Sequence, residues 1–279
     1  NSGVYGGKDN RASYGRAHWL NYYHQTIAHN GLLIYDPAEA PGKDTKFIAT
    51  NDGGQQWPNK ANDHPRDLPY LLKPEHGYKM GNVTAWEFGP DSNAPEYTYI
   101  AGDISNAYSK NKVDKVTRSM LTLNTGNDRT PCILVVYDQV KSTQPDFQKN
   151  WLIHSLDEPE VSGNTIIIQN KRAHYKGELT YSGQLNVTSL LPKQTNLSKI
   201  GGKGKEYWIE SADHNFFAEN TSKGTEAAHW RIEVSPEQTA EEDRFLHVLS
   251  ATSAGMPLVY QKPKLMESHD LEGALFSKC

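Results

Sequence analysis

The sequence lacks several features that would assign it to a common class of protein. Two of its 279 residues are cysteines, Cys132 and Cys279, so no disulfide framework can be read from it. No stretch approaches the about 18 consecutive apolar residues of a membrane-spanning helix, and we expect no membrane partner. The net charge is small, -4 from 29 basic and 33 acidic residues, which argues against nucleic acid as a partner.

Motifs of several enzyme classes are also missing. There is no GxSxG nucleophile motif, no glycine pattern of a nucleotide-binding loop and no CxxC pair. Aspartates and glutamates are scattered along the chain, so a glycosidase pair of carboxylates is neither indicated nor excluded. An assignment of function must therefore come from other residues.

Aromatic residues are abundant for so polar a sequence. The chain has 6 Trp, 15 Tyr and 7 Phe, while its hydrophobic fraction is 36%. Such rings mostly fill β-sheet cores, and they can also stack on the faces of sugar rings. The length exceeds the about 100 to 200 residues of a usual domain, but a single β-sandwich can reach about 250. We expect one large sandwich with at most a small appendage.

From Val113 onward hydrophobic and polar residues alternate, which is typical of half-buried antiparallel strands. Turn signals such as Asn124-Thr-Gly-Asn and Gly201-Gly-Lys-Gly separate the segments. The expected strands are Val113–Leu123, Ile133–Val140, Asn150–Leu156, Thr165–Gln169, Ala173–Thr180, Leu185–Leu191, Glu206–Glu210, Trp230–Ser235 and Phe245–Ala251. We therefore predict an all-β fold, a large antiparallel β-sandwich, with Cys132 buried as a small apolar residue.

The first third of the sequence has a different character. Gly31–Tyr35 reads as one short strand, and Asp36–Tyr78 is rich in Pro, Gly, Asn and Asp, as in a long surface loop. Loops of that length are uncommon unless they serve a function. The expected division is 1–255 for the sandwich, with 1–112 carrying the active site and 113–255 the regular strands, and 256–279 for a C-terminal extension or the start of a small further β domain.

The segment Tyr14–Pro37 is the most informative part of the chain. Arg16, His18, His24, His29 and three tyrosines fall within sixteen positions, which is more polar functional groups than a structural segment requires. Function is the better explanation for such a density. The alternative for any single histidine is a core residue hydrogen-bonded to the backbone.

His29 directly precedes an apolar strand and would be held rigidly, as a metal ligand must be. The spacings of six and five residues between His18, His24 and His29 match neither a helical HExxH motif nor a zinc knuckle, so spacing alone does not indicate a metal. Tyr14 could act as an acid and base if cations such as Arg16 lower its pKa from about 10.

In an ordered series of motifs the chain resembles the C-terminal region of the heparinase II/III family of polysaccharide lyases, and most closely its heparinase II branch. The motifs are Asn1-Ser-Gly-Val-Tyr, Asn21-Tyr-Tyr, Thr26-Ile-Ala-His-Asn, Leu33-Ile-Tyr-Asp-Pro, Ala101-Gly-Asp, Ala107-Tyr, Val116-Thr-Arg-Ser, Val136-Tyr-Asp-Gln-Val, Trp151-Leu-Ile-His-Ser-Leu-Asp-Glu-Pro, Lys199-Ile-Gly-Gly-Lys-Gly-Lys-Glu and Trp230-Arg-Ile-Glu-Val-Ser-Pro. Each is weak alone, and together they are specific.

The resemblance implies an N-terminal α/α toroid followed by a β-sandwich, with the active site between them. No part of this sequence reads as a toroid, so we expect this chain to be the sandwich and to need the toroid for activity. Such a lyase removes the proton alpha to a uronate carboxylate and protonates the leaving oxygen, and the developing negative charge requires strong donors nearby. The implied substrate is an acidic polysaccharide, with heparin or heparan sulfate favoured.

The resemblance also implies roles for individual residues. Tyr14 is expected to be catalytic; Arg16, His18, His24 and Asn30 to bind substrate; and His29 and Asn1 to bind zinc. The family usually has Asp where this sequence has Asn1, and an amide is a poorer zinc ligand than a carboxylate. A periplasmic or secreted bacterial location and a homodimer are further expectations from the family.

Two other functions stay open on the sequence alone. A non-catalytic carbohydrate-binding module would also account for the aromatic residues and for the lack of a toroid. An accessory sandwich of a glycoside hydrolase fits the fold but gives no reason for the segment Tyr14–Pro37, and it ranks last.

Overall fold

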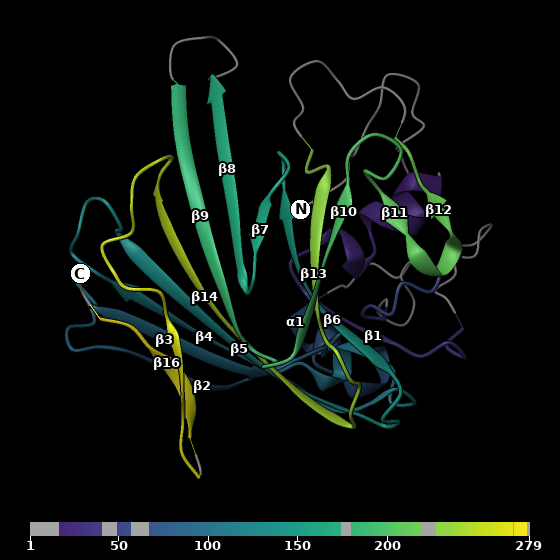
Figure 1. Ribbon diagram of the computed structural model, residues 1–279. Helices are drawn as coiled ribbons and strands as arrows, with labels where there is room; N and C mark the ends of the chain where they lie inside the picture. Colours follow the sequence, from purple (N-terminus) through teal and green to yellow (C-terminus); the bar gives the residue numbers. More distant parts are fainter. Residues whose placement is uncertain are drawn as a thin grey trace.

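Antiparallel strand pairing dominates the chain. The computed structural model describes residues 17–40, 49–56, 67–173, 180–218, 227–269 and 271–277. These residues form one eight-stranded and one four-stranded antiparallel sheet together with two separate hairpins (Figure 1). The predicted all-β sandwich is thereby confirmed.

The larger sheet holds most of the strands that the alternating pattern predicted. In order across the sheet they are β2 (Asn82–Gly89), β3 (Tyr97–Asp103), β4 (Val113–Asn124), β5 (Cys132–Ser142), β14 (Glu242–Ser253), β9 (Thr180–Leu191), β8 (Thr165–Ala173) and β7 (Glu160–Ser162). In the second half of β5, Val136, Asp138 and Val140 are buried while the residues between them are half-buried. This period of two is the one read from the sequence.

The smaller sheet lies against part of the larger one. Its order is β1 (Leu32–Tyr35), β6 (Gln148–Ser155), β13 (Trp230–Pro236) and β10 (Thr195–Gly201). The hairpins are β11 (Trp208–Ile209) with β12 (His214–Asn215), and β15 (Lys264–Glu267) with β16 (Glu272–Leu275). The helical turns are η1 (Trp19–Tyr23), η2 (Thr26–Ala28), α1 (Leu68–Leu71), η3 (Pro74–His76), η4 (Ser105–Ala107) and η5 (Glu210–Ala212).

The main hydrophobic core lies between the two sheets. The small sheet contributes Trp151, Ile153 and Ile232, and the large sheet contributes residues such as Val140 and Phe245. On the outer face of the large sheet, the β15–β16 hairpin packs through Leu265 and other residues onto a second cluster. The residues of 256–277 that the structure describes thus add a layer to the sandwich.

The inner face of the large sheet extends beyond the small sheet. Trp86, Ile100, Met120, Val136 and His247 are direct cross-strand neighbours from β2 to β14. Val136 and His247 are buried in the core, whereas Trp86 is 67% exposed, Ile100 39% and Met120 38%. One row of side chains therefore runs from the core to an open apolar surface at the β2 edge.

The structure also corrects several expectations. The strand expected over Glu206–Glu210 is reduced to the two residues of β11, because a helical turn follows directly. Most of the strand expected over Ala173–Thr180 lies outside the described residues. Strands β2, β3 and β10 were not predicted, and Cys132 is half-buried where full burial was expected. Among the described residues, no helix has the length and apolar character needed to cross a membrane.

A buried ion pair joins the large sheet to the turn before β1. Arg118 of β4 donates to Asp138 of β5 from Nε to Oδ1 at 2.6 Å and from Nη2 to Oδ2 at 2.9 Å. Asp138 is fully buried, which raises its pKa, and the Arg118 charge acts in the opposite direction. The remaining Nη1 donates to the carbonyl oxygen of Asn30 at 3.1 Å. One arginine thus fixes both a strand pair and the entry to the small sheet.

Replacing Arg118 alone should be strongly destabilising. Arg118→Leu leaves Asp138 buried without its partner, and we expect a loss of about 3 to 5 kcal/mol in the free energy of unfolding. Urea denaturation measures this, with the exposed Arg129→Leu as a control that should stay within about 0.5 kcal/mol of the parent. The double variant with Asp138→Leu should recover much of the loss. A single-variant loss below about 1 kcal/mol would contradict this account.

A second buried polar group, His247, lies between the two sheets next to Trp151. The His247 ring stacks on the Trp151 indole with centroids 3.8 Å apart. Both of its nitrogens are buried and without a hydrogen-bond partner among the described residues. Burial lowers the pKa of His247 to about 3, and the nearby Arg118 charge acts in the same direction. The core therefore holds this imidazole in its neutral form.

His247 should make stability depend on pH. Its pKa is about 3 in the folded chain and near the ordinary 6.5 when unfolded. Between these two pH values the unfolded chain binds more protons at this histidine than the folded chain does. The contribution of neutral His247 to the free energy of unfolding is therefore intact above about pH 6.5. It is lost as the pH falls below that value, by at most about 1.4 kcal/mol per pH unit. We expect His247→Phe to flatten the stability profile measured by urea denaturation between about pH 7 and 4. The exposed His214→Gln should leave the slope unchanged, and equal slopes for His247→Phe and the parent would refute the assignment.

Candidate functional site

The histidine-rich segment covers the outer face of the small sheet. Tyr22, Ile27 and Leu33 pack there with Leu152 and Tyr207 in one hydrophobic cluster. These contacts hold η1, η2 and β1 as successive parts of a single surface. Of the predicted site residues, Asn1, Tyr14 and Arg16 lie outside the described residues, and the positions of the other four are given below.

His18 is a buried part of this cluster. It is 1% exposed, and its Nδ1 donates to the carbonyl oxygen of Phe216 at 2.7 Å. Its ring meets the Tyr207 ring edge to face, with centroids 4.6 Å apart. Burial lowers the pKa of His18, while the bond to Phe216 acts in the opposite direction. In this structure His18 joins η1 to the β11–β12 hairpin.

His24 and His29 lie at the surface and close to each other. The His24 ring lies 4.0 Å from that of Trp19, measured between centroids. Burial lowers the pKa of His24, and the nearby His29 lowers it further. Burial is also the main cause of the lowered pKa of His29. A hydrogen bond with the Tyr23 backbone and the charge of Asp52 both act in the opposite direction and raise this pKa. Both imidazoles are therefore largely neutral at neutral pH, the form needed by a general base or a metal ligand.

Asn30 connects the two sheets at the turn into β1. Its Oδ1 accepts from the backbone N of His154 at 3.1 Å and lies 3.0 Å from the Nδ1 of the same histidine. The other ring nitrogen of His154 donates to the Ile27 carbonyl oxygen at 2.9 Å. Asn30 and His154 also line a groove between the sheets, opposite Gln184 and Thr252. The amide oxygen of Asn30 is thus engaged within the fold.

Asp52 positions the turn that carries His29. Its Oδ2 accepts from the backbone N of Ile27 at 3.0 Å, and its Oδ1 accepts from the backbone N of Gly54 at 2.8 Å. At Gly54 a β-carbon would lie 2.5 Å from the β-carbon of Thr26, so this close approach requires glycine. Burial raises the pKa of Asp52, and the two amide bonds act in the opposite direction. The Asp52 loop therefore clamps η2 against the small sheet.

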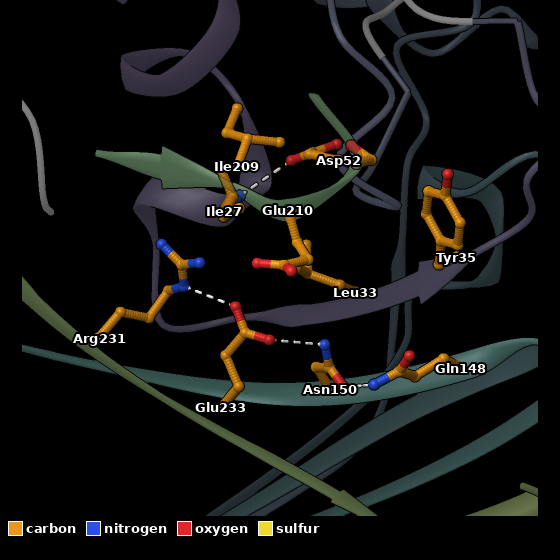
Figure 2. A pocket seen from close by; sticks show the side chains of 11 residues that line it. Ile27, Leu33, Tyr35, Asp52, Gln148, Asn150, Ile209, Glu210, Arg231 and Glu233 are labelled. Atoms are coloured by element: carbon orange, nitrogen blue, oxygen red, sulfur yellow. Dashed lines mark hydrogen bonds and ion pairs between the residues drawn. The ribbon is translucent and has the colours of Figure 1, made fainter. Parts of the chain in front are cut away.

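A cavity of about 210 Å³ opens beside this clamp, on the outer face of the small sheet (Figure 2). Ile27, Leu33 and Ile209 form its apolar wall. Its polar lining comes from β1, β6, β13, η5 and the Asp52 loop, and consists of Tyr35, Gln148, Asn150, Arg231, Glu233, Glu210, Ser211 and Asp52. Sequence reasoning did not identify this cavity.

The most unusual group in the cavity wall is Arg231, which is 2% exposed. Its Nε donates to Oε1 of Glu233 at 2.7 Å, and Oε2 of Glu233 accepts from Nδ2 of Asn150 at 2.8 Å. Its Nη2 is buried and has no hydrogen-bond partner in the described part of the chain. A buried donor without a partner costs about 1 to 3 kcal/mol, so such groups call for an explanation.

The described residues fit a zinc ion only in part. Among those described, no three of the types His, Cys, Asp and Glu come together as a metal-binding group. His29 by itself has suitable chemistry, because its imidazole is largely neutral and bonded to a backbone group, as a ligating histidine usually is. The described residues thus supply one ligand of the set that the resemblance implies.

Several residues of this region were missed by sequence reasoning. Asp52 precedes two glycines, Gly53 and Gly54, and this Asp-Gly-Gly signal for a tight turn could have marked it. Arg231 and Glu233 alternate on β13 within a motif already noted for its resemblance. The sequence alone does not show that the side chains of Arg231 and Glu233 lie on the outer face of the small sheet, because this depends on how the two sheets pack against each other.

No protein-family model and no curated protein matches the chain. Among solved structures, it is similar to heparinase III, with a TM-score of 0.40 and 10% identity, over 71% of this chain and 27% of that one. It is also similar to a mutant of the heparan sulfate lyase HepC from Pedobacter heparinus, with a TM-score of 0.43 and 12% identity, over 78% of this chain and 33% of the other. The chain thus spans a third or less of either. Neither is named as a heparinase II, and the resemblance to that branch stays a prediction.

Replacing Asp52 with Asn should loosen the clamp and change His29. The amide keeps one acceptor but brings an NH₂ group against a backbone N–H, and we expect the free energy of unfolding to fall by about 1 to 3 kcal/mol. Loss of the negative charge should also lower the pKa of His29, which an NMR titration measures directly. Asp128→Asn, at an exposed position, is the matched control. An unchanged stability together with an unchanged His29 titration would show that Asp52 has no such role.

Proposed function

We propose that this chain is the β-sandwich part of a polysaccharide lyase that cleaves a uronic-acid polymer by β-elimination. The observation that carries the proposal is the pair His24 and His29, two largely neutral imidazoles at the surface, close enough for His29 to lower the pKa of His24, whose ring lies against that of Trp19. The ordered motifs that resemble heparinase II/III lyases include this segment. The proposed substrate is an acidic polysaccharide, with heparin or heparan sulfate favoured.

The chemistry assigns a role to each type of group. A base removes the proton alpha to the uronate carboxylate, the carbon–oxygen bond to the leaving sugar breaks, a carbon–carbon double bond forms, and an acid protonates the leaving oxygen. We assign the proton transfers to Tyr14 together with groups of the toroid. His24, with Arg16, contacts the sugar and its carboxylate. His18 and Asn30 hold the histidine segment in place for the substrate, because both form hydrogen bonds within the sandwich.

His29 is proposed as the zinc ligand of the sandwich. Its imidazole is oriented by the hydrogen bond with Tyr23 and by the nearby Asp52 clamp. When bound, zinc would supply positive charge and would cross-link the histidine segment to neighbouring parts of the protein. Asn1 and a residue upstream would complete the ligand set. We further propose that the toroid belongs to the same polypeptide, which acts in the periplasm or outside a bacterial cell, as a homodimer.

The test is the formation of unsaturated product by the whole polypeptide that carries this chain. It should raise the absorbance in the unsaturated-uronate band on at least one of heparin, heparan sulfate, chondroitin sulfate, alginate and ulvan. His24→Ala should lower kcat/KM by roughly 10- to 100-fold, the effect of losing a hydrogen bond of about 1.5 to 3 kcal/mol to the charged substrate. His29→Ala and a zinc chelator should each lower it at least about tenfold.

His214→Ala is the matched control, because His214 is exposed on β12 and outside the histidine segment. Its activity should equal that of the parent. If the complete polypeptide gives no absorbance rise on any of the five polymers, the lyase proposal is wrong. Saturable binding of a polymer without cleavage would then identify a non-catalytic carbohydrate-binding module.

A further inference from the structure

A second cavity, of about 300 Å³, lies on the outer face of the large sheet, on the side away from the small sheet. Three aromatic rings from separate elements line it, those of Tyr97 in β3, Tyr260 before β15 and Phe276 directly after β16. In Figure 1 the C-terminal hairpin lies beside β3 at this side of the sheet. The cavity shares no lining residue with the one beside the Asp52 clamp.

Two of the three rings form a corner. The Tyr260 and Phe276 rings are 6.0 Å apart between centroids and stand at 80° to each other. Both pack against the outer hydrophobic cluster that contains Ile133. The backbone N of Gln261 donates to the carbonyl oxygen of Ser277 at 2.9 Å, which joins the residues that follow the two rings. The corner is therefore held in place by the fold.

The charge at this cavity is negative. Among the described residues that line it, Glu96 is the single charged one, and it is exposed. The hydroxyl of the neighbouring Tyr97 donates to Oε1 of Glu87 at 2.5 Å. A phenol that donates to a carboxylate carries more negative charge on its ring, and the attraction between a ring face and a cation becomes stronger.

The remaining polar side chains of the lining are partly engaged within the fold. The Thr125 hydroxyl donates to the Thr130 carbonyl oxygen. Oδ1 of Asn124 accepts from the backbone N of Gly126 at 3.3 Å. The main acceptors that the side chains still offer to a ligand are thus the Glu96 carboxylate and the hydroxyls of the two tyrosines.

This lining disfavours several classes of ligand. Sulfate, phosphate and uronate groups find no cation in the lining and are repelled by its carboxylate. A divalent metal ion requires several oxygen ligands, and a primary ammonium requires acceptors for three N–H groups, whereas this wall is mostly aromatic. A sugar ring stacks on one flat ring face and does not fit a corner of two.

A quaternary ammonium group matches the lining better than any of these. It has no N–H group that needs an acceptor, and its methyl groups carry the positive charge to the ring faces. Its rounded shape lets it contact several rings at the same time. Recognition of such groups by clusters of aromatic rings is a recurring use of the cation–π attraction.

We infer that this cavity binds a quaternary ammonium group of the choline type, held against the rings of Tyr97, Tyr260 and Phe276 with the Glu96 carboxylate next to it. The ligand class is a small organic cation without an anion close to its ammonium group, because a phosphate there would face Glu96. Binding of this cation requires no lyase chemistry, so it goes beyond the proposed function and holds whether or not that function is correct.

A titration of the full chain, followed by the proton NMR signal of the N-methyl groups, tests this site. Choline and tetramethylammonium should bind saturably, and their methyl signals should move upfield because aromatic rings shield groups above their faces. The carbon analogue of choline, with a tert-butyl group in place of trimethylammonium, keeps the shape without the charge and should bind about five- to thirtyfold more weakly. Ethanolamine, phosphocholine and methyl glucoside should each bind at least about fivefold more weakly than choline.

A pair of variants at Tyr260 separates the ring from the hydroxyl. Tyr260→Phe keeps the ring and should bind choline within about twofold of the parent, whereas Tyr260→Leu should weaken binding at least about fivefold. Glu96→Gln removes an exposed charge and should weaken binding about two- to fivefold. Glu160→Gln is the control, because Glu160 is exposed on β7 at the opposite edge of the large sheet, and it should have no effect.

Any one of four results would overturn the inference. The first is that neither choline nor tetramethylammonium binds saturably to the parent chain. The second is that the carbon analogue or ethanolamine binds as tightly as choline. The third is tighter binding of phosphocholine or methyl glucoside, which would identify a lipid headgroup or a sugar as the ligand. The fourth is equal choline binding by Tyr260→Leu and Tyr260→Phe. If Tyr260→Leu does not fold, the exposed Glu96→Gln and the carbon analogue decide.

Discussion

The bidentate pair of Arg118 and Asp138 is the interaction on which the arrangement of this sandwich depends. An unpaired charge in the core would be very costly, so the two strands that carry the pair can adopt only the register that brings the groups together. The third contact of Arg118, to the Asn30 carbonyl, then fixes where the small sheet begins. The histidine segment is attached to this same turn. The position of a surface site is thereby set from the interior of the larger sheet.

Other buried cations follow the same principle. Lys112 is fully buried and donates to the Gly54 carbonyl at 2.7 Å and to Glu39 at 2.5 Å. Lys149 is likewise buried and donates to the Ala240 carbonyl at 2.5 Å, with Asp243 at 2.8 Å. In each case a carboxylate and backbone carbonyls, one for Lys112 and two for Lys149, replace the water that the ammonium group loses. Because the Gly54 carbonyl belongs to the loop that clamps η2, Lys112 ties that loop to the large sheet. Arg231 differs, since one of its donors is left over.

The fold was largely predictable from the sequence, and the site only in part. The strands from Val113 onward were predicted because their burial alternates, as in β5, and the period of two survives in any half-buried strand. Strand β2 was not predicted because the alternation of Val83-Thr-Ala and Trp86-Glu-Phe is interrupted between Ala85 and Trp86, next to the bulge in its pairing with β3. His24 and His29 were predicted as site residues from the density of histidines and aromatic residues around them, and this stays a prediction. The cavity beside the Asp52 clamp was not predicted, because its walls come from β1, β6, β13 and two loops that only the folded chain brings together.

The open row of side chains at the β2 edge has a consequence for handling the protein. β2 is an edge strand, and its backbone groups on the side away from β3 pair with no other described strand. On its exposed face the rings of Trp86 and Phe88 stack on each other, and Phe88 is 42% exposed. Charged residues and proline usually protect such an edge from joining another chain, yet between Asn82 and Gly89 the single charged side chain is Glu87. We therefore expect copies of this chain in concentrated solution to associate through this edge, with β2 of one copy pairing with a strand of another.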